Sequence, residues 1–415
     1  MTVTDAPSDT LTDDQVRDLV VAWLRENLPD KWMDAVDADD DATLRLARMG
    51  MDQTEFLHRL GAAGWSTPTW PKEYSGAGLE PSQARVVNEV LSQYKVPRSW
   101  NVIGLGMGGP TVMQWANDEI KQRYLPPLAQ HKEIWCQLFS EPGAGSDAAG
   151  MGTRAVRDGD EWVVNGQKVW TTLAHIASVG MLVARTNPDV PKHKGLTYFL
   201  VDMHAPGVEV RPLKQITGDA EFNEVFFTDV RIPDSHRLGN EGDGWAVATT
   251  TLMNERVALS GAGSGSDNVG GGPVDGLITL AKSNGQWDDL VVRDRLMRAL
   301  IEQRVLKITN YRAASARKSG KQPGPEGSVT KLFSAEHNQR LQNLAVDLLG
   351  AGGMAWTGDD QAASTVRGFL RSRANTIEGG TSEVMRNILG DRVLGLPREP
   401  DGSRDQAWKD VPRNG

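Results

Sequence analysis

The positions of the apolar residues divide the chain into three blocks, and the first block has a helical period. Apolar side chains recur at helical spacing from Val16 to Leu24 and from Thr54 to Gly64, as expected for helices that bury one face. Thr12 and Gln15 form a capping-box pair before the first helix. The glycine that ends the second run is typical of a helix C-terminus. Residues 1–133 therefore predict a helical N-terminal domain.

The second block has the pattern of short strands. Asn165-Gly166 is the preferred two-residue turn, so a hairpin is expected from Glu161 to Trp170, centred on this pair. Other runs of β-branched and aromatic residues between turns predict strands at Leu196–Val201, Val208–Val210 and Val225–Ile232. Residues 134–234 thus predict a small β-domain or barrel.

In the third block, after Trp245, the helical period returns. Long helical patterns cover Asp289–Ser315, Ser328–Leu349 and Glu383–Leu394, with Gly320–Gly327 as a connector. Gly261–Gly272 has almost no apolar residue to bury, which indicates a mobile loop or a segment that shapes a pocket. We therefore expect a helical domain at residues 235–400 and a polar tail at 401–415. The order of the blocks favours an α+β fold over an alternating parallel sheet.

Composition excludes several classes of protein. A chain of 415 residues is too long for one hydrophobic core, so two or three packed subdomains are expected. The net charge of -9, with no basic cluster, argues against nucleic-acid binding. Cys136 is the single cysteine and the histidines show no ligand spacing, so no disulfide or metal site is expected. Residues 1–5 do not resemble a signal peptide, and no apolar run has the length of a membrane span. These features predict a cytoplasmic protein.

One glycine-rich motif is a weak candidate for nucleotide binding. Gly104–Gly109 matches the G-x-G-x-x-G pattern, but no strand clearly precedes it and Pro110 follows it. The dinucleotide fingerprint requires a strand before the glycines and a helix after them. We therefore do not expect a dinucleotide site in this segment.

Two segments of the β-block carry candidate chemistry. Ser140–Asp147 is a loop with two hydroxyls on a Gly/Pro-rich turn, and Asn165–Thr172 ends in Trp-Thr-Thr. A flavin requires an apolar wall for its ring, hydrogen bonds to its edge, and amides or hydroxyls near its pyrophosphate. Trp170 can supply the wall, and Thr172 lies on the same strand face. Taken singly, each segment is also compatible with a surface turn or an ordinary hairpin, but their co-occurrence favours a flavin site.

These segments resemble the acyl-CoA dehydrogenase family, and the resemblance extends from Trp65 to Pro400. The other matching motifs are the Trp70-Pro71 loop and the segments Phe222–Pro233, Leu349–Gly353, Gly379–Glu383 and Arg392–Pro397. The resemblance implies a helical N-terminal domain, a central β-domain and a C-terminal four-helix bundle. FAD would lie between the β-domain and the bundle, and a neighbouring subunit would complete part of its site. It also implies α,β-desaturation of an acyl-CoA thioester, electron-transfer flavoprotein as acceptor, and a homodimer or homotetramer.

Matching of motifs also implies which residues meet the ligands. The implied cofactor-binding residues are Leu138, Ser140, Gly145, Ser146, Trp170, Thr172, Asp347, Gly350, Thr381 and Glu383. Among these, Ser140 would meet the pyrimidine side of the flavin, and Thr172 its N5 edge. Ser146 would lie near the pyrophosphate of FAD or of the substrate, and Arg256 near the substrate. Thr381 and Glu383 would lie at a helix start, where anionic groups are favoured.

The sequence indicates the position of the catalytic base less directly. Removal of the α-proton requires a desolvated carboxylate. Many family members have a glutamate directly before the C-terminal Gly-Thr, but here that position is Gly379 and Glu378 stands one residue earlier. Other members, which resemble isovaleryl- and long-chain dehydrogenases, carry the base on a helix before an arginine. Glu255-Arg256 matches that pattern, so Glu255 is the first candidate, Glu378 the second, and a subunit without a base the third.

Two departures from the family pattern lie on the adenine side of the implied cofactor site. Leu280–Gly285 lacks the arginine that many members place there, although Lys282 adds a positive charge, and Asp347 stands where a neutral glutamine is common. An acidic group facing a pyrophosphate weakens binding. The departures motivate an alternative function, a flavin-poor partner subunit in a hetero-oligomer. An acyl-CoA oxidase, which passes electrons to oxygen, is a third hypothesis.

Overall fold

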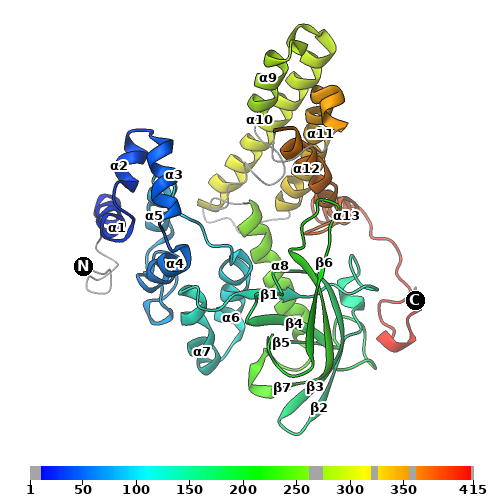
Figure 1. Cartoon of the computed structure of the whole chain (residues 1–415). Coiled ribbons are helices and arrows are strands. Elements are labelled where there is room, and N and C mark those ends of the chain that lie inside the picture. The colour runs from blue at the N-terminus through cyan, green and yellow to red at the C-terminus, as the bar shows by residue number, and fades with distance from the viewer. Residues whose placement is uncertain (1–10, 261–273, 319–325, 355–360, 413–415) are drawn as a thin grey trace.

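The computed structural model describes residues 11–260, 274–318, 326–354 and 361–412. Figure 1 shows the N-terminal helices on one side, a twisted sheet beside them, and a group of C-terminal helices above the sheet. Helix α8 runs between the sheet and the upper helices. No helix in the described ranges combines the length and apolar character of a membrane span.

The N-terminal block is helical, as its period predicts. Its α-helices are α1 (Asp13–Asn27), α2 (Trp32–Asp37), α3 (Asp41–Met49), α4 (Gln53–Ala62), α5 (Pro81–Gln93), α6 (Gly109–Trp115) and α7 (Asp118–Ala129). The predicted capping box is confirmed: Gln15 N donates to Thr12 Oγ1 at 3.3 Å, and Thr12 N donates to Gln15 Oε1 at 2.8 Å. Gly64, just beyond α4, has φ +82°, which explains the glycine there.

The G-x-G-x-x-G segment forms a helix rather than a phosphate-binding loop. Residues Gly104–Gly108 adopt a π-helix that continues into α6. A Cβ at Gly108 would lie 2.7 Å from the Trp135 ring, and one at Gly109 would lie 2.2 Å from the Trp70 ring. These glycines therefore allow two tryptophans to pack closely against the helix. This packing accounts for the glycines of the motif without a dinucleotide.

The central block forms one sheet. Its strands are β1 (Trp135–Leu138), β2 (Arg154–Asp158), β3 (Glu161–Thr172), β4 (Val179–Arg185), β5 (Leu196–Asp202), β6 (Val208–Leu213), β7 (Phe222–Pro233) and β8 (Arg237–Leu238). The order is β6-β7-β3-β2-β4-β5-β8, and β1 pairs with β4 in parallel. Separate apolar clusters lie on the two faces, one of them shared with α6, α7 and α8. The sheet therefore joins the N-terminal helices to α8 through a common core.

The predicted turn at Asn165-Gly166 is wrong, because β3 runs through this pair without turning. The hairpin instead joins β2 to β3, and its turn lies earlier in the chain, at Gly159, which has φ +63°. Asn165 instead bonds across to Asp229 of β7, with Nδ2 to Oδ1 at 2.9 Å. A Cβ at Gly166 would lie 2.5 Å from Thr153 Oγ1, and the register shifts at this point. The pair thus lies opposite a bulge of β7 at Asp229, and the close approach of Thr153 requires glycine at position 166.

The third block is helical. Its helices are α8 (Gly244–Ser260), α9 (Val274–Ser283), α10 (Leu290–Lys318), α11 (Glu326–Leu349), α12 (Gln361–Ser372) and α13 (Ser382–Arg392). The expected mobile loop at Gly261–Gly272 lies outside the described residues. Of the expected connector, the last two residues begin α11 and the rest lies outside the described ranges. The tail runs from α13 down beside the sheet and ends in a short 3-10 helix, Trp408–Asp410.

Candidate functional site

The loop after β1 is held against β3 by a buried ion pair. Lys168 Nζ lies 2.8 Å from Glu141 Oε1 and 3.0 Å from the carbonyl oxygen of Phe139. Val169 N donates to the carbonyl oxygen of Ser140 at 2.9 Å. The Glu141 carboxylate also accepts the amide hydrogens of Gly152 and Thr153 at 2.6 Å and 2.9 Å. One carboxylate therefore fixes both ends of the loop from Ser140 to Thr153.

The charges of this pair stabilise each other against the cost of burial. Burial favours the neutral form of each group. For Glu141, burial raises the pKa, but Lys168 and the amide donors outweigh it and hold the pKa below the ordinary value. Burial lowers the pKa of Lys168, and Glu141 opposes that shift. The short motifs do not reveal this ion pair. In a strand of alternating polar and apolar residues, the sequence gives no sign that the charged Lys168 is buried.

Trp170 presents its ring to the surface next to this loop. Its side chain is 61% exposed and its backbone has φ +61°. Phe222 contacts the ring edge-on, with the centroids 6.2 Å apart. A left-handed backbone at a large, exposed apolar residue costs free energy, and such strain is often found at functional sites. Thr172, which faces Phe222 across β3 and β7, is half-buried beside it. The exposed indole fits the apolar wall that a flavin ring requires.

The predicted phosphate-binding turn is open to ligands. Gly145 and Ser146 are exposed, and a Cβ at Gly143 or Gly145 would meet no atom within 4 Å. These glycines are therefore not needed for packing, which is consistent with their amides facing a ligand. Leu138 is different: its side chain is fully buried in the core of the sheet, and its predicted contact with a cofactor stays a prediction.

Helix α8 carries the first candidate base, and buried hydroxyls fix the turn before it. Glu255 and Arg256 lie on α8, but their side chains lie outside the described part of the structure. Thr251, one turn earlier, is fully buried. Its Oγ1 lies 3.1 Å from Thr111 Oγ1 of α6 and 3.2 Å from Tyr198 Oη of β5. The helix is thereby positioned against the N-terminal helices and the sheet.

The second candidate base is engaged by an arginine. Glu378 receives two hydrogen bonds from Arg371, at 3.1 Å and 2.9 Å, and one from Asn375 Nδ2 at 2.8 Å. A bidentate guanidinium engages both oxygens of the carboxylate and fixes their orientation. The Arg371 guanidinium also lies 5.9 Å from the Phe222 ring centroid. Arg371 and Phe222 thus link this part of the C-terminal domain to Trp170, although neither stands out in the sequence.

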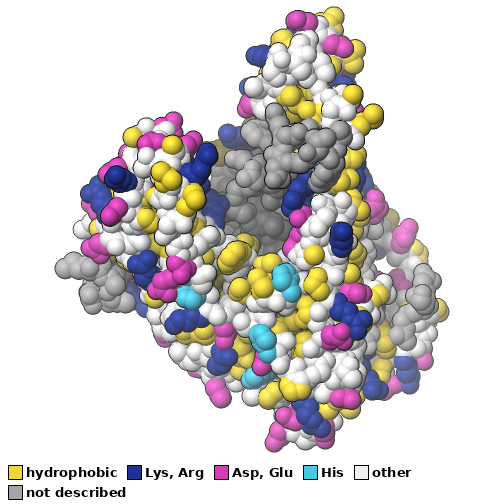
Figure 2. All heavy atoms as spheres, in the orientation of Figure 1, with side chains coloured by type: hydrophobic (Ala, Val, Ile, Leu, Met, Phe, Trp, Pro, Cys, Tyr) yellow, Lys and Arg dark blue, Asp and Glu magenta, His cyan; other side chains and the backbone are white. Residues whose placement is uncertain are grey.

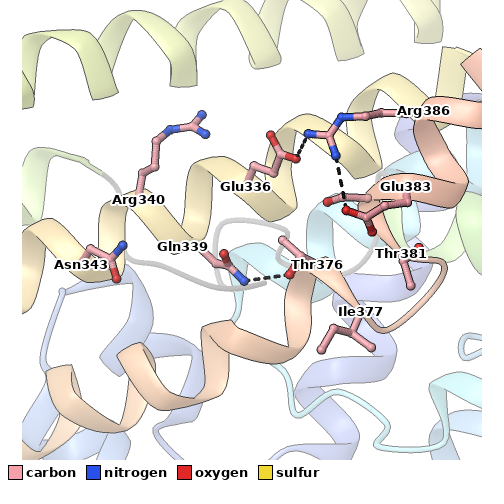
Figure 3. A pocket seen from close by; sticks show the side chains of 10 residues that line it. Glu336, Gln339, Arg340, Asn343, Thr376, Ile377, Thr381, Glu383 and Arg386 are labelled. Carbon is pink, nitrogen blue, oxygen red and sulfur yellow. Dashed lines mark hydrogen bonds and ion pairs between the residues drawn. The ribbon is translucent and has the colours of Figure 1, made fainter.

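The start of α13 opens on a cavity of about 500 Å³. Thr381 is the N-cap, because its Oγ1 accepts the Val384 amide hydrogen at 3.1 Å. Figure 3 shows Arg386 between the carboxylates of Glu336 and Glu383, both of which it contacts. Amides at a helix start favour an anionic group. Thr381 and Glu383 lie at a helix start, as the sequence predicts, and they line a polar cavity between α11 and α13.

The adenine-side residues already have partners within the chain. Asp347 Oδ2 lies 2.6 Å from Arg295 Nη2, so the acidic side chain is paired with a cation of α10. Lys282, considered above as a replacement for the missing arginine, stacks on the Trp287 ring at 5.1 Å. Gly350 begins the turn after α11 with φ +55°. Arg295 is a residue that sequence reasoning missed, since it lies on a separate helix.

The surface of the molecule is mixed in character around these elements. Figure 2 shows apolar, acidic and basic side chains interspersed on the visible face, with no large field of one charge. This distribution agrees with the absence of a basic cluster in the sequence. It gives no support to a nucleic-acid interface on that face.

Comparison with known proteins decides the family. Three family models match consecutive parts of the chain: the acyl-CoA dehydrogenase N-terminal domain at residues 10–132, the middle domain at 136–230 and the C-terminal domain at 242–394. The chain belongs to the acyl-CoA dehydrogenase family. It is therefore an oxidoreductase of a family that depends on FAD and acts in lipid metabolism. The α+β three-domain fold expected from the resemblance is confirmed.

Relatives and solved structures agree with this family. Acyl-CoA dehydrogenase IpdE1 of Mycobacterium tuberculosis is 39% identical over 397 residues, which are 94% of this chain and 99% of that protein. A solved structure named Tcur3481-Tcur3483 steroid ACAD, in a G363A variant, is 28% identical with a TM-score of 0.73 and covers 93% of this chain and 99% of its own. The ChsE4-ChsE5 complex of M. tuberculosis is 28% identical with a TM-score of 0.70 and covers 94% and 99%.

Proposed function

We propose that this acyl-CoA dehydrogenase desaturates a thioester with a bulky, ring-bearing acyl group, and that Glu255 is the base. The observation that carries the proposal is the exposed indole of Trp170 on the strand that binds the Ser140 loop, while the glutamate-bearing helix α8 shares an apolar cluster with Ala144 of the same loop. The similarity to a protein named a steroid ACAD supports a ring-bearing acyl group. Exposed apolar side chains on α8 and before the π-helix, Met253 and Val102, add apolar surface for such a group.

Each residue of the site has one task in this reaction. When bound, FAD supplies the acceptor for the hydride that leaves the β-carbon. Trp170 would hold the flavin ring, and Ser140 and Thr172 would hold its edge through their hydroxyls. Glu255 takes the α-proton on its carboxylate, and Arg256 orients the thioester. The amides of Gly145 and Ser146 hold pyrophosphate oxygens at the open turn.

Glu378 is the weaker candidate for the base. Its carboxylate accepts three hydrogen bonds, two of them from Arg371. A base must present a carboxylate oxygen to the substrate, and both oxygens of Glu378 are engaged by Arg371. In the proposed mechanism Glu378 therefore keeps Arg371 in place beside Phe222, and Glu255 performs the proton transfer.

The proposed partners follow from the same site. Electron-transfer flavoprotein is the proposed acceptor, as is usual for the family. The similar structures carry the names of pairs, Tcur3481-Tcur3483 and ChsE4-ChsE5, which supports a hetero-oligomer. The Arg295–Asp347 ion pair weighs the other way, because it neutralises the acidic side chain that would repel a neighbour's pyrophosphate. A partner subunit that completes another chain's site is thus the second candidate function.

Absorbance spectroscopy tests the proposal. The purified protein is mixed anaerobically with acyl-CoA thioesters that carry linear, branched or fused-ring acyl groups, and the flavin bands are followed. We expect bleaching by a ring-bearing thioester. A protein that remains colourless with added FAD would instead support the partner-subunit function. Rapid return of the colour in air would indicate an oxidase.

Matched substitutions distinguish the two glutamates. Glu255→Gln keeps the shape of the side chain and removes the proton acceptor, so the bleaching rate is expected to fall by several powers of ten while FAD remains bound. Glu378→Gln is the control and is expected to have a much smaller effect. If Glu378→Gln abolishes bleaching and Glu255→Gln does not, the assignment of the base is wrong.

A further inference from the structure

The C-terminal tail has a defined docking site on the β-domain, although its sequence is polar. Trp408 N donates to the carbonyl oxygen of Val190 at 2.9 Å, and Lys409 N donates to that of Pro188 at 3.1 Å. Lys409 Nζ also lies 2.6 Å from Asp189 Oδ1. Figure 1 shows the tail reaching this position from α13 along the side of the sheet. The tail therefore joins the C-terminal helices to the loop between β4 and β5.

Trp408 contacts a buried arginine. Its ring centroid lies 4.2 Å from Arg185 Cζ, and Arg185 is only 2% exposed. The guanidinium donates to the carbonyl oxygens of Met151, Lys192 and Ala149 at 3.1, 2.9 and 2.6 Å. A guanidinium buried among carbonyl oxygens is stabilised further when an aromatic face covers it. Trp408 thus covers the cation that gathers these carbonyls.

The same indole also contacts the site loop directly. Trp408 Nε1 donates to the carbonyl oxygen of Gly150 at 3.1 Å. Gly152, two residues on, lies against the edge of the ring, since a Cβ built there would be 3.7 Å from Trp408 Cζ2. The amide of Gly152 donates to Glu141 Oε2, the carboxylate that anchors the Ser140 end of the loop. A continuous series of contacts therefore runs from the tail to Ser140.

We propose that Trp408 is a positioning residue that fixes the loop from Ser140 to Thr153, and with it the amides that hold a pyrophosphate group. The inference rests on the proposed function for the identity of the ligand, because FAD and coenzyme A both carry a pyrophosphate. Within the open turn, the side chain of Ala144 is buried and its backbone exchanges two hydrogen bonds with Glu141, which holds the Ser140 end of the loop. Gly143 and Gly145 are exposed and add no packing. The far end of the loop is held by the contacts of Arg185 and Trp408 with backbone carbonyls.

Three variants of the full-length chain test this role. Trp408→Ala removes the aromatic cover and the indole hydrogen bond. Trp408→Phe keeps an aromatic face over Arg185 and loses only the hydrogen bond to Gly150. Lys409→Ala, the matched control, removes the exposed ion pair with Asp189 and leaves the indole in place. Circular dichroism first checks that all three variants fold.

The first readout is hydrogen exchange in the peptide that covers the amides of Gly152 and Thr153. Trp408→Ala is expected to accelerate their exchange about tenfold, since it removes a desolvated cation–π contact and a hydrogen bond. Trp408→Phe is expected to restore most of the protection, and Lys409→Ala to leave it unchanged. Equal exchange in Trp408→Ala and the wild type would overturn the proposal, because the tail would then only rest on the surface.

The second readout is ligand binding. We expect Trp408→Ala to raise the dissociation constant of FAD, or the KM for the thioester, about tenfold, with kcat at saturation nearly unchanged. A change in FAD binding alone assigns the loop to FAD, and a change in KM alone assigns it to coenzyme A. Faster exchange with both affinities unchanged would refute the positioning role. If no thioester bleaches the wild-type flavin, the proposed function fails, while FAD and free coenzyme A titrations still test Trp408.

Discussion

Replacement of Glu141 by glutamine is the sharpest test of how the Ser140 loop is held. The variant keeps the size of the side chain and removes the charge that lies 2.8 Å from Lys168 Nζ. The Lys168 side chain is 0% exposed and that of Glu141 is 10% exposed. At an effective dielectric constant near 20, such charges attract by about 6 kcal/mol, and desolvation cancels a large part of this. Removal of one partner is expected to cost about 3–5 kcal/mol, because it leaves a buried charge uncompensated.

The assay measures local opening of the loop, since a chain with several cores has no single well-defined free energy of unfolding. Val169 N donates to the carbonyl oxygen of Ser140 at 2.9 Å, so hydrogen exchange at the Val169 amide reports whether the loop remains on β3. A cost of about 3 kcal/mol corresponds to roughly a hundredfold faster exchange. We expect that increase in Glu141→Gln.

A surface ion pair between β3, the strand of Lys168, and β7 supplies the control. Glu161 lies 2.9 Å from Arg231, but these side chains are 42% and 55% exposed. Glu161→Gln is expected to change the protection of Val169 by less than about 1 kcal/mol. The double variant Lys168→Met/Glu141→Gln removes the buried cation as well and is expected to recover part of the loss. Unchanged exchange in Glu141→Gln, or a double variant that is worse than the sum of the single variants, would refute the buried-pair argument.

The pair also predicts a dependence on pH. The pKa of Glu141 in the folded protein is held below its ordinary value of 4.5. The stabilisation is therefore fully present above that ordinary value and is lost as the pH falls through the lowered pKa. Protection of Val169 should accordingly decrease on acidification in the wild type. In Glu141→Gln the same acidification should produce a smaller decrease.

Two further substitutions test the helix and the indole wall. Thr251→Val keeps the shape of the side chain but leaves the hydroxyls of Thr111 and Tyr198 without this partner. We expect a loss of about 1–3 kcal/mol in stability and a lower kcat with unchanged FAD affinity. An unaltered kcat would show that the hydroxyl group does not position α8. Trp170→Ala is expected to weaken FAD retention about tenfold in apoprotein titrations, whereas the exposed Trp100→Ala should not; equal FAD retention in both variants would remove Trp170 from the proposed site.

The order of the blocks could be predicted because it depends on local periodicity. Runs such as Val16–Leu24 and Leu196–Val201 carry the helical or strand pattern within themselves, and their elements lie where the sequence places them. The turn at Asn165-Gly166 failed for a related reason. The dipeptide is compatible with either a turn or a bulge, and pairing with Asp229 of β7 decides between them. A contact 64 residues away is not visible in the local pattern.

The chemistry of the site was partly predictable in the same sense. Residues that we propose to face a ligand, such as Trp170 and Ser146, form short motifs, and in the structure they are exposed at the surface. The groups that support them do not form motifs. Lys168 reaches Glu141 from 27 residues away, and Trp408 reaches Gly150 from 258 residues away. Their roles arise from the topology of the sheet and the course of the tail.

These supporting contacts share one physical requirement. Gly143 and Gly145 are exposed and add no packing energy, as expected if their amides face a ligand. The conformational entropy of the turn must then be offset by its other contacts. The buried Ala144 supplies one of them, and buried cations hold the two ends of the loop, Lys168 at one end and Arg185 at the other, each of which binds backbone carbonyls. A buried cation needs a counterpart, and Glu141 and the Trp408 ring are those counterparts. The tail is therefore expected to matter for ligand binding as much as the motif residues that it never touches.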